Sequence, residues 1–558
     1  MQQLAEHPWQ RIPLDGRYAI PAPEKRPLYS LLADSAKSHP NNLCVHYQGR
    51  DFTYAQVEEI SSRFASALVS LGVKKGNRVA IFMPNIPQLV FSYFGILKAG
   101  GIVVMCNPIY KERELEFQLK DSGAEVVVAS RTVAKGMDLF KSLADCRERL
   151  SLKHVISTSL TDYLPPLKKR LAGLAGIKDV PRPDTVDFVK LVESNPPSES
   201  PAVVDPVNDT ALLQYTGGTT GVAKGAMLTH YNLVSNAVYG ARLFPLTEKD
   251  VSLCALPLFH IYGLTVTMNM PISVGAALVL LPSFHVEEVA KTIEKMKVTT
   301  FSGAPAMYIA INSKPNAKDF KLHSVRACMS GGSALPPAVR RKFIELTGGS
   351  LVEGYGLSET SPVTHVNPLI GGVVKDGSIG PPFCGTDARI VDTENREKVL
   401  PLGEVGELAV KGPQVMKGYW NKQAETDAVL EDGWFLTGDI AKMDEDGYFY
   451  IVDRKKDMIN VGGFKVYPRE VEDVLFEHPN IKETGVIGIP DAFSGEVVKA
   501  FVVVKDPSKK LTEQEVIDFC VQRIAKFKAP KKVEFMDELP KTLIGKVLRR
   551  KLREIPQK

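Results

Sequence analysis

The sequence has 558 residues, of which 44% are hydrophobic and 24% charged, and its formal net charge is +5. This composition excludes a disordered or collagen-like chain, and the length predicts two or more domains. The seven cysteines show no C-x-x-C spacing and the histidines no H-x-x-x-H spacing, which excludes a zinc ribbon, a dithiol redox motif and a helical zinc site.

Charge and thiols also limit the partners and the compartment. Scattered, odd-numbered cysteines are typical of a reducing cytosol, so we expect a cytoplasmic protein. The basic excess falls in residues 454–558 without the series of interleaved aromatic side chains on which nucleic acids stack, and we expect no nucleic-acid partner. Residues 1–27 are polar and lack the apolar core of a secretory signal.

The first part of the chain alternates between helix and strand patterns. Thr53 and Gln56 form a capping box before a helical apolar repeat, and Gly72 marks the end of that helix. Short apolar runs then alternate with helical patterns, which is typical of doubly wound α/β sheets. The expected strands are 78–83, 102–105 and 126–128, and the expected helices are 88–98 and 112–121.

Residues 251–286 contain no charged side chain and could be mistaken for a membrane span. Five prolines and glycines interrupt the run, and Asn269 lies near its middle, so buried strands and a short helix are expected instead. A second helix–strand series covers 231–352, and short strands prevail over 379–452. A small α+β unit with a helix at 470–477, strands at 485–489 and 499–504, and a helix capped by Thr512 and Glu515 is expected after Arg454.

The most informative segment is Tyr215-Thr-Gly-Gly-Thr-Thr-Gly-Val-Ala-Lys224-Gly, which follows an apolar strand and precedes a helix that can begin at Thr229. Glycines let the backbone direct its N–H groups at phosphate oxygens, and the hydroxyls and the lysine add donors. It is not a Walker A loop, because Gly225 rather than Ser or Thr follows Lys224. The alternative, a flexible Gly/Thr turn, does not account for the terminal lysine.

Six further motifs follow this loop in order, and with it they resemble the adenylate-forming superfamily of acyl-CoA synthetases, luciferases and nonribosomal adenylation domains. The likeness extends from about residue 28 to 554 and is greatest with bacterial long-chain fatty acid–CoA ligases. The motifs are Gly331-Gly-Ser-Ala-Leu335, Tyr355-Gly-Leu-Ser-Glu-Thr360, Trp434-Phe-Leu-Thr-Gly-Asp439, Asp453-Arg-Lys-Lys-Asp457, Gly462-Gly-Phe-Lys-Val-Tyr-Pro468 and Pro540-Lys-Thr-Leu-Ile-Gly-Lys546.

The resemblance implies a fold and a domain plan. An AMP-binding region of stacked doubly wound α/β subdomains plus a β-barrel-like subdomain would occupy 1–453 and bind ATP and the acyl substrate. Residues 454–456, with Lys456 as the pivot, would form a hinge. A small mobile α+β domain, 457–558, would carry the catalytic lysine. A domain that swings can present different groups to one carbonyl in two successive half-reactions.

The resemblance also implies roles in ATP binding. Glu359 would hold Mg²⁺ against ATP, since a hard cation prefers carboxylate and phosphate oxygens. Thr360 would donate to the α-phosphate, Tyr355 would stack on adenine, and Asp439 would accept both ribose hydroxyls with help from Arg454. The remaining expected nucleotide contacts are Thr216, Gly217, Gly218, Thr219, Thr220, Gly221, Lys224, Gly331, Gly332, Ser333, Glu353, Gly354, Gly356 and Lys546.

Lys546, Glu359 and Thr216 are the catalytic residues that the resemblance implies. Lys546 would reach the carboxylate and the α-phosphate while negative charge builds up as pyrophosphate leaves. Gly331 and His260 would line the acyl site, although a core histidine is an open alternative for His260. Leu264 occupies the position of a tryptophan that gates the fatty-acid tunnel in some relatives, which puts that gate in doubt. Gly462, Gly463 and Phe464 would meet coenzyme A.

Residues 164–178 differ from compact members of the superfamily. One helical face would carry leucines and the other Lys168, Lys169 and Arg170, a pattern that can bind an anionic membrane. A plain amphipathic surface helix, which Gly173 and Gly176 weaken, is the favoured alternative.

The sequence therefore predicts a Mg²⁺-dependent ligase that joins a long-chain fatty acid to coenzyme A at the expense of ATP, through an acyl adenylate. Medium-chain or aryl-CoA ligation remains an alternative within the superfamily, and a non-catalytic lipid-binding or uptake protein remains one outside it. Fatty acid, ATP and coenzyme A are the expected partners. Weak contact with the inner membrane face and a homodimer stay open.

Overall fold

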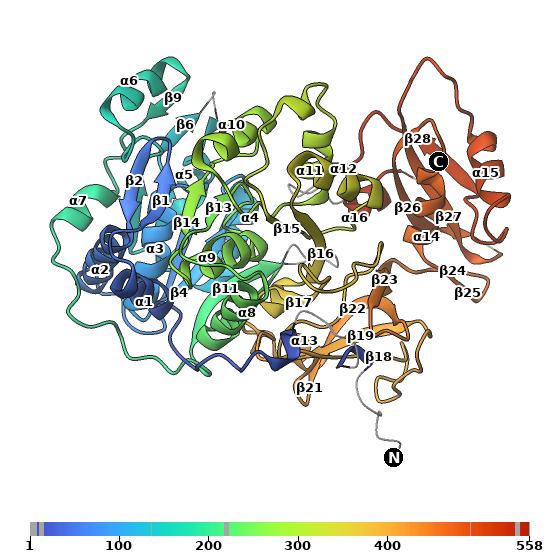
Figure 1. The fold of residues 1–558 in the computed structure, drawn as a ribbon, viewed down its shortest axis with the longest axis horizontal. Coiled ribbons are helices and arrows are strands. Elements are labelled where there is room, and N and C mark those ends of the chain that lie inside the picture. The colour runs from blue at the N-terminus through green and yellow to red at the C-terminus, as the bar shows by residue number, and fades with distance from the viewer. Residues whose placement is uncertain are drawn as a thin grey trace.

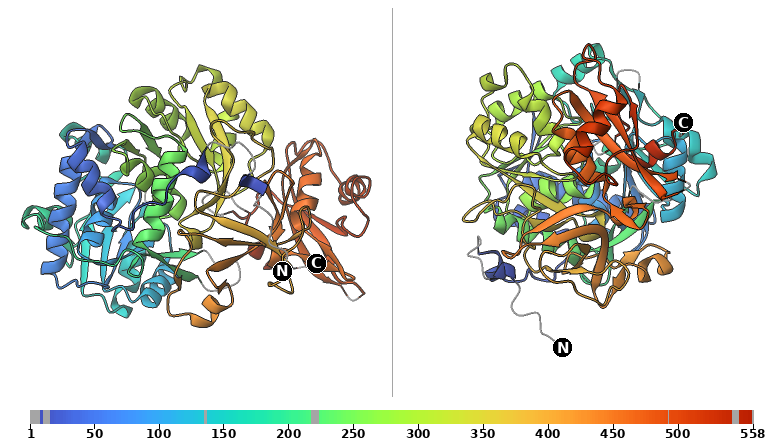
Figure 2. Two further views of the ribbon diagram at one scale, coloured as in Figure 1. Left: turned by 60° about the horizontal axis from the view of Figure 1, so that its bottom comes forward. Right: turned by 90° about the vertical axis from the view of Figure 1, so that its right-hand side faces the viewer.

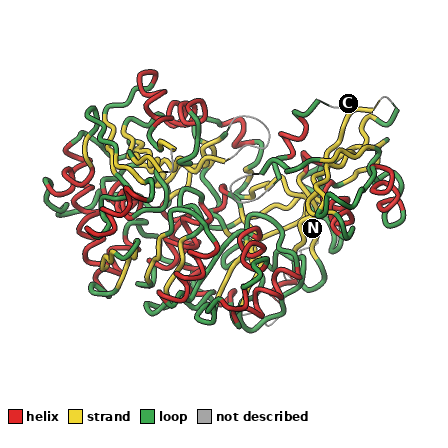
Figure 3. The backbone as a smooth tube through the Cα atoms, turned by 90° about the horizontal axis from the view of Figure 1, so that it is seen from above, coloured by secondary structure: helices red, strands yellow, loops and turns green. Residues whose placement is uncertain are grey.

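A computed structural model describes residues 8–10, 16–134, 137–216, 223–491, 493–541 and 547–556 of the protein. A large N-terminal region is followed by a small unit that lies at one end of the molecule (Figures 1 and 2). Strands form the interior of the large region and most helices lie around them (Figure 3). This arrangement confirms the expected α/β architecture with a separate C-terminal unit.

An eight-stranded sheet forms the first half of the large region, in the order β10-β8-β5-β3-β4-β11-β12-β20. The pairs from β10 to β11 are parallel and the last two are antiparallel. The strands are β3 (Arg78–Phe82), β4 (Ile102–Cys106), β5 (Val126–Ser130), β8 (His154–Thr158), β10 (Val186–Asp187), β11 (Thr210–Thr216), β12 (Lys224–Thr229) and β20 (Gly418–Tyr419).

The helices of this half follow the sequence pattern closely. The predicted capping box of Thr53 and Gln56 opens α2, in which apolar side chains at helical spacing are buried. α3 is buried along its whole length, as a helix packed between a sheet and another helix must be. The helices are α1 (Ser30–Ser38), α2 (Tyr54–Ser70), α3 (Pro87–Lys98), α4 (Glu112–Ser122), α5 (Lys141–Cys146) and α7 (Phe188–Glu193).

A second set of strands packs beside the first, in the order β13-β14-β1-β2, with β15-β16-β17 continuing from it. Isolated bridges from Thr300 to Ser252 and to Ala327 connect the two groups. The strands are β1 (Leu43–Tyr47), β2 (Arg50–Thr53), β13 (Val251–Cys254), β14 (Ala277–Leu280), β15 (Ala327–Ser330), β16 (Ser350–Gly356) and β17 (Val363–Val366), and the helices are α8 (His230–Leu243), α10 (Val286–Met296), α11 (Pro305–Asn312) and α12 (Pro337–Thr347).

The uncharged segment 251–286 is internal. It forms β13, a π-helical stretch η4 (Gly263–Asn269), α9 (Met270–Ile272) and β14, nearly all of them buried. Among the described residues, no helix has both the length and the apolar character that a membrane crossing requires.

An antiparallel five-stranded sheet closes the large region. Its order is β18-β19-β22-β21, with β23 paired to β22. Its strands are β18 (Asp387–Val391), β19 (Gly406–Lys411), β21 (Leu430–Glu431), β22 (Trp434–Met443) and β23 (Phe449–Arg454), with α13 (Gln423–Asp427) beside them.

The C-terminal unit has an apolar core of its own, because the buried side chains of its sheet and helices form clusters separate from those of the large region. The expected capping box of Thr512 and Glu515 opens α15. The elements are β24 (Ile459–Val461), β25 (Phe464–Val466), α14 (Pro468–Phe476), β26 (Ile481–Asp491), β27 (Gly495–Val504), α15 (Glu513–Val521), β28 (Lys532–Phe535) and α16 (Arg549–Arg553).

A small excursion extends from the large region at the end opposite the C-terminal unit (Figure 1). It consists of a three-stranded sheet, β7 (Met137–Asp138), β6 (Thr132–Ala134) and β9 (Ile177–Asp179), and the helix α6 (Pro166–Leu174). The helix ends before Ile177, which begins β9, so the single helical face expected over 164–178 is shorter than the leucine spacing indicated.

Candidate active site

The two ends of the Gly/Thr loop are neighbours in the eight-stranded sheet. Thr216 ends β11, Lys224 begins β12, and the two residues are paired across the hairpin. Gly217, Gly218, Thr219, Thr220 and Gly221 lie outside the described residues. The helix expected to begin at Thr229 is confirmed, because Thr229 caps α8. The strand β12, in which Ala226 and Leu228 point into the core, was not expected between the loop and that helix.

Glu359 and Lys224 meet at one tyrosine. Glu359 lies in a short 3-10 turn, η6 (Ser358–Thr360), which follows β16. The Tyr419 hydroxyl donates to Glu359 Oε1 at 2.8 Å, and Lys224 Nζ lies 4.1 Å from the centroid of the Tyr419 ring. Burial and the nearby Glu359 raise the pKa of Tyr419, so its hydroxyl keeps its proton. The structure thus brings together an acidic side chain, a basic side chain and an aromatic ring at the loop end of the β11–β12 hairpin.

These residues fit a magnesium ion shared with phosphates. Within the described ranges, no three His, Cys, Asp or Glu side chains form a metal cluster. Mg²⁺ is commonly held by one or two carboxylates together with substrate phosphates rather than by an all-protein cage. Glu359 could supply that single carboxylate, and Lys224 could bind phosphate oxygens beside it.

A second group joins β16 to the five-stranded sheet. Asp439 and Arg454 are paired across β22 and β23, and Arg454 Nε lies 2.6 Å from Asp439 Oδ1. The Tyr355 hydroxyl donates to Asp439 Oδ2. Asp439 is only 2% exposed. The two donors, which come from different elements, hold its carboxylate in one position. Each carboxylate oxygen has a second lone pair that remains able to accept a ribose hydroxyl.

Thr360 is fully buried and its hydroxyl is already occupied. Oγ1 lies 2.5 Å from the carbonyl oxygen of Pro362 and accepts a 3.0 Å bond from the Leu357 N–H. The predicted donation to an α-phosphate would therefore have to replace the bond to Pro362. That role stays a prediction.

Among the described glycines predicted to meet the nucleotide, Gly354 and Gly356 lie where a side chain would collide, and Gly331 is tightly packed. A Cβ on Gly356 would lie 2.0 Å from the Pro362 carbonyl oxygen, and one on Gly331 would lie 3.2 Å from the Tyr262 ring. Gly332 has φ +86, which favours glycine. Gly354 would collide with Met329, and Ser333 is exposed. Close packing alone explains Gly354 and Gly356, so a nucleotide contact is not needed to account for them.

Glu353 is a buried carboxyl beside these glycines. It is 8% exposed, and its Oε2 accepts a 3.2 Å bond from the Leu335 N–H. Burial raises the pKa of Glu353 to about 7, because removal from water disfavours the charged form. The carboxyl therefore titrates near neutral pH.

Of the residues expected at the acyl site, His260 lies between β13 and the π-helical stretch η4, Leu264 lies within η4, and Gly331 directly follows β15. His260 Nδ1 accepts a 3.2 Å bond from the Tyr262 N–H, and burial lowers the pKa of His260 to about 4, so the ring is neutral near pH 7. Leu264 is fully buried within η4. Such π-helical turns are rare in proteins overall, and many of those that occur are at functional sites. Residue spacing in the sequence does not reveal them.

The expected hinge begins at the last residue of β23, and the expected coenzyme A face follows it. Lys456 Nζ is buried and makes no hydrogen bond to any residue that the structure describes, and burial lowers the pKa of Lys456 to about 8. Gly462 and Gly463 have φ +60 and +89, and a Cβ on either would meet open space. Phe464 is 60% exposed. Lys546 lies outside the described residues.

Sequence reasoning missed two features of the site. Tyr419 lies in the stretch Val410-Lys-Gly-Pro-Gln-Val-Met-Lys-Gly-Tyr-Trp420, for which no role was expected from the sequence. Arg549 lies three residues beyond Lys546, and no role was assigned to it from the sequence. No local signal distinguished it from Arg550 or Arg553, since its three carboxylate partners are far away in sequence.

Comparisons with known proteins agree with this geometry. The chain matches the AMP-binding enzyme family over residues 32–420 and the AMP-binding enzyme C-terminal domain over 470–546. It is 45% identical to a long-chain-fatty-acid–CoA ligase of Bacillus subtilis, over 99% of this chain and 98% of that protein. It is 41% identical to a protein of the same name from Salmonella typhimurium, over 98% and 97% of the two chains.

Solved structures show the same fold. ATP-bound MatB from Rhodopseudomonas palustris superposes with a TM-score of 0.83 at 31% identity, covering 95% of this chain and 98% of MatB. The o-succinylbenzoate CoA synthetase MenE from Bacillus subtilis, in complex with its acyl-adenylate intermediate, gives 0.78 at 29% identity with the same coverage. The chain therefore belongs to the family of AMP-binding enzymes and is an AMP-forming acid–thiol ligase.

Proposed function

We propose that this protein is a long-chain fatty acid–CoA ligase, which converts a fatty acid, ATP and coenzyme A into acyl-CoA, AMP and diphosphate. The observation that supports it most is that one motif, Tyr355 to Thr360, contributes a residue to each of two clusters: Glu359 with Lys224 at Tyr419, and Tyr355 with Asp439 and Arg454. The first suits phosphates and the second suits a ribose. The names of the full-length relatives support a long-chain acid as substrate.

The first half-reaction would form an acyl adenylate. A carboxylate oxygen of the fatty acid attacks the α-phosphorus of ATP, and the bond from that phosphorus to the bridging oxygen of diphosphate breaks. Lys224 would bind phosphate oxygens and Asp439 would hold the ribose, so that the α-phosphorus is fixed in front of the attacking oxygen. Mg²⁺, when bound at Glu359, supplies positive charge that offsets the charge of the leaving diphosphate.

The second half-reaction would form the thioester. The sulfur of coenzyme A attacks the acyl carbonyl carbon, and the carbon–oxygen bond to AMP breaks. The open space around Gly462 and Gly463 would admit the pantetheine arm. The neutral ring of His260 is buried on the expected acyl side and would present no charge to an aliphatic chain.

The direct test incubates the purified protein with ATP, Mg²⁺, coenzyme A and one acid at a time. Octanoate, palmitate and benzoate serve as the acids, and diphosphate release and acyl-CoA mass are both measured. The proposal expects palmitoyl-CoA at the highest kcat/KM. Preference for benzoate or octanoate would replace the long-chain assignment, and palmitate binding without diphosphate release would indicate a lipid-binding protein.

We also propose weak contact with an anionic membrane through α6. The leucines of this helix do not pack on the protein: Leu167, Leu171 and Leu174 are 71%, 49% and 86% exposed, and only Ala172 is buried. A plain amphipathic surface helix would bury its apolar face instead. Lys168, Lys169 and Arg170 are exposed on the same helix, so apolar and basic side chains are presented together.

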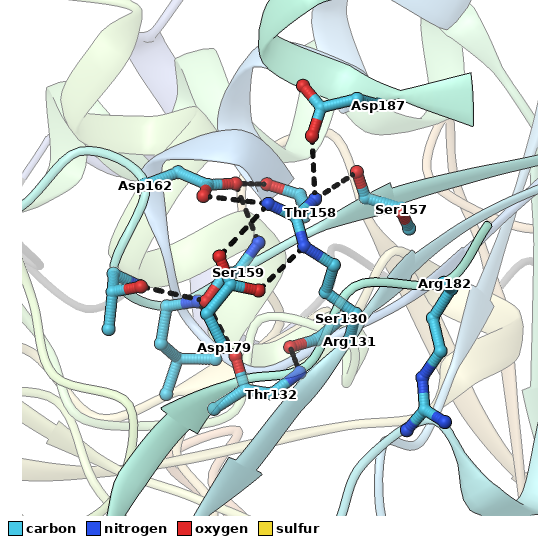
Figure 4. A network of polar contacts seen from close by, with 12 residues as sticks. Ser130, Arg131, Thr132, Ser157, Thr158, Ser159, Asp162, Asp179, Arg182 and Asp187 are labelled. Carbon is cyan, nitrogen blue, oxygen red and sulfur yellow. Dashed lines mark hydrogen bonds and ion pairs between the residues drawn. The ribbon is translucent and has the colours of Figure 1, made fainter. Parts of the chain in front are cut away.

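The excursion that carries α6 is firmly attached. Arg131, directly after β5, lies 2.7 Å from Asp179 of β9, 3.1 Å from Asp162 before α6 and 3.0 Å from Asp187 of β10. Figure 4 shows these carboxylates converging on the one guanidinium. The exposed leucines therefore belong to a helix that is anchored to the protein. This favours a docking surface rather than a loosely attached segment.

A further inference from the structure

Arg549 is enclosed by three carboxylates. Its guanidinium lies 2.8 Å from Asp453, 3.3 Å from Asp457 and 2.7 Å from Glu472. The Asp453, Asp457 and Glu472 side chains are 2%, 9% and 13% exposed, and that of Arg549 is 16% exposed. Charge-assisted hydrogen bonds among buried groups are stronger than those at the surface, so this cluster fixes the start of α16.

The three acids lie on opposite sides of the expected hinge. Asp453 belongs to β23 and thus to the five-stranded sheet of the large region, whereas Asp457 follows residues 454–456 and Glu472 lies on α14 of the C-terminal unit. A rotation at 454–456 would carry Arg549 and Glu472 together. It would separate Arg549 from Asp453.

Asp453 receives a second contact from the C-terminal unit. Its Oδ2 accepts a 2.6 Å bond from the Arg469 N–H, at the start of α14. Its other oxygen accepts from the Arg454 N–H and from Arg549. Two of the three donors to this carboxylate therefore lie beyond the hinge.

The position of this cluster connects it to the chemistry. Arg454, next to Asp453 in the chain, forms the ion pair with Asp439 at the proposed ribose site. Arg549 stands three residues after Lys546 in the sequence. The contact between Asp453 and Arg549 thus ties the chain that follows the expected catalytic lysine to the strand that leads into the ribose site.

We propose that Asp453 and Arg549 form a latch across residues 454–456 that holds the C-terminal unit in the orientation for adenylation. This proposal rests on the function proposed above. Arg549 acts as a positioning residue, because its guanidinium is occupied by the three carboxylates and orients the segment after Lys546.

The cluster is suited to opening and closing. When Asp453 separates, Arg549 keeps Asp457 and Glu472 as partners, so no cation is left buried without compensation. Asp453 becomes accessible to water once the unit moves away. The latch therefore opens at the cost of two charge-assisted contacts to Asp453, those from Arg549 and from the Arg469 N–H. Loss of Arg549 itself would instead leave Glu472 buried without its ion-pair partner.

The test compares Asp453→Asn with Glu472→Gln in the full chain. Each variant removes one negative charge from Arg549, but only the first lies across the hinge. The two half-reactions are measured separately: diphosphate release from ATP and palmitate, and thioester formation from supplied palmitoyl-AMP and coenzyme A. In Asp453→Asn we expect adenylation to fall about tenfold relative to thioester formation, the size of one lost charge-assisted hydrogen bond. The ratio in Glu472→Gln should match that of the wild type.

Distances between spin labels provide a readout that is independent of turnover. Every cysteine in the described part of the chain is buried, so labels can be placed at Glu394→Cys and Lys482→Cys, both at exposed positions on opposite sides of the hinge. With ATP bound, Asp453→Asn should show less of the main wild-type distance and more of a second one, and Glu472→Gln should not.

The outcomes separate the latch from the function. Equal ratios and equal distances in Asp453→Asn and the wild type overturn the latch, as does an equal shift in Glu472→Gln. A single distance in the wild type with either ATP or AMP plus coenzyme A also overturns it. Failure of the wild type to release diphosphate with any acid overturns the proposed function, whereas the distances still decide on the latch.

Discussion

The Tyr419 hydroxyl donates a 2.8 Å hydrogen bond to Glu359, and Lys224 Nζ lies over the face of the same ring. The Tyr419 side chain therefore sets the distance between Glu359, the expected metal ligand, and Lys224, the expected phosphate-binding cation. β20 is short, but its pairing with β12 sets this position, because Tyr419 and Ala226 are direct neighbours in the sheet. The acid and the base come from segments 135 residues apart, and the tyrosine fixes their relation.

Tyr419→Phe isolates the hydroxyl, because the ring that carries Lys224 is retained. We expect the Mg²⁺ concentration for half-maximal rate to rise and kcat/KM to fall about tenfold, as for the loss of one hydrogen bond to a charged group. Tyr448→Phe, which loses a hydroxyl bonded to the Val373 carbonyl oxygen, is the matched control. Glu359→Ala should raise the Mg²⁺ requirement further or abolish turnover. A Mg²⁺ titration unaltered in both site variants would remove Glu359 from the metal role.

Asp439→Asn should weaken nucleotide binding. The amide cannot accept from Tyr355, Arg454 and two ribose hydroxyls at once, and one of its two polar atoms is a donor facing other donors. We expect the Kd for ATP and for AMP to increase about 10- to 100-fold, since a hydrogen bond to a charged group contributes about 1.5–3 kcal/mol. Calorimetric titration with AMP, which carries no β- or γ-phosphate, measures the effect. Unchanged AMP affinity would mean that Asp439 serves the fold alone.

Glu353 should make stability depend on pH. Its folded pKa of about 7 is above the ordinary value of 4.5, so its contribution is complete below about pH 4.5 and is lost as the pH rises through 7. The full effect is on the order of 3 kcal/mol, from 1.36 kcal/mol per pKa unit. Glu353→Gln should therefore lose less thermal stability than the wild type between pH 5 and pH 8. If the melting temperatures of the two proteins changed equally between pH 5 and pH 8, this interpretation of Glu353 would be contradicted.

The basic and apolar parts of α6 should act together on vesicles. Replacing Lys168, Lys169 and Arg170 by Gln should lower co-sedimentation with anionic vesicles at low salt, since each basic residue near such a surface contributes about 1 kcal/mol. Replacing Leu167 and Leu174 by Ser should lower it at high salt too. Lys509→Gln with Lys510→Gln, at exposed positions in the C-terminal unit, is the control. If none of these substitutions changed vesicle binding, α6 would be a plain surface helix with no role at the membrane.

The capped helices and the buried strands could be predicted from the sequence, because capping boxes and apolar runs are local patterns. The capping boxes at Thr53 and Thr512 were found where the structure has them. The hairpin that encloses the Gly/Thr loop was missed, because β12, Lys224–Thr229, shows little alternation of apolar and polar residues. The Tyr419 and Arg549 contacts could not be foreseen from spacing, since each joins segments that only the folded sheet brings together.

The central claim is that one site performs two half-reactions with different residues. Single-turnover rates for both halves in Lys546→Ala and Gly463→Leu test it most directly. Lys546→Ala should lose about 10²-fold or more in adenylation, the scale of one transition-state donor, and still convert supplied palmitoyl-AMP to thioester. Gly463→Leu, at a position with φ +89 and open space around it, should release diphosphate once and fail to form acyl-CoA. Equal loss of both half-reactions in both variants would contradict the account.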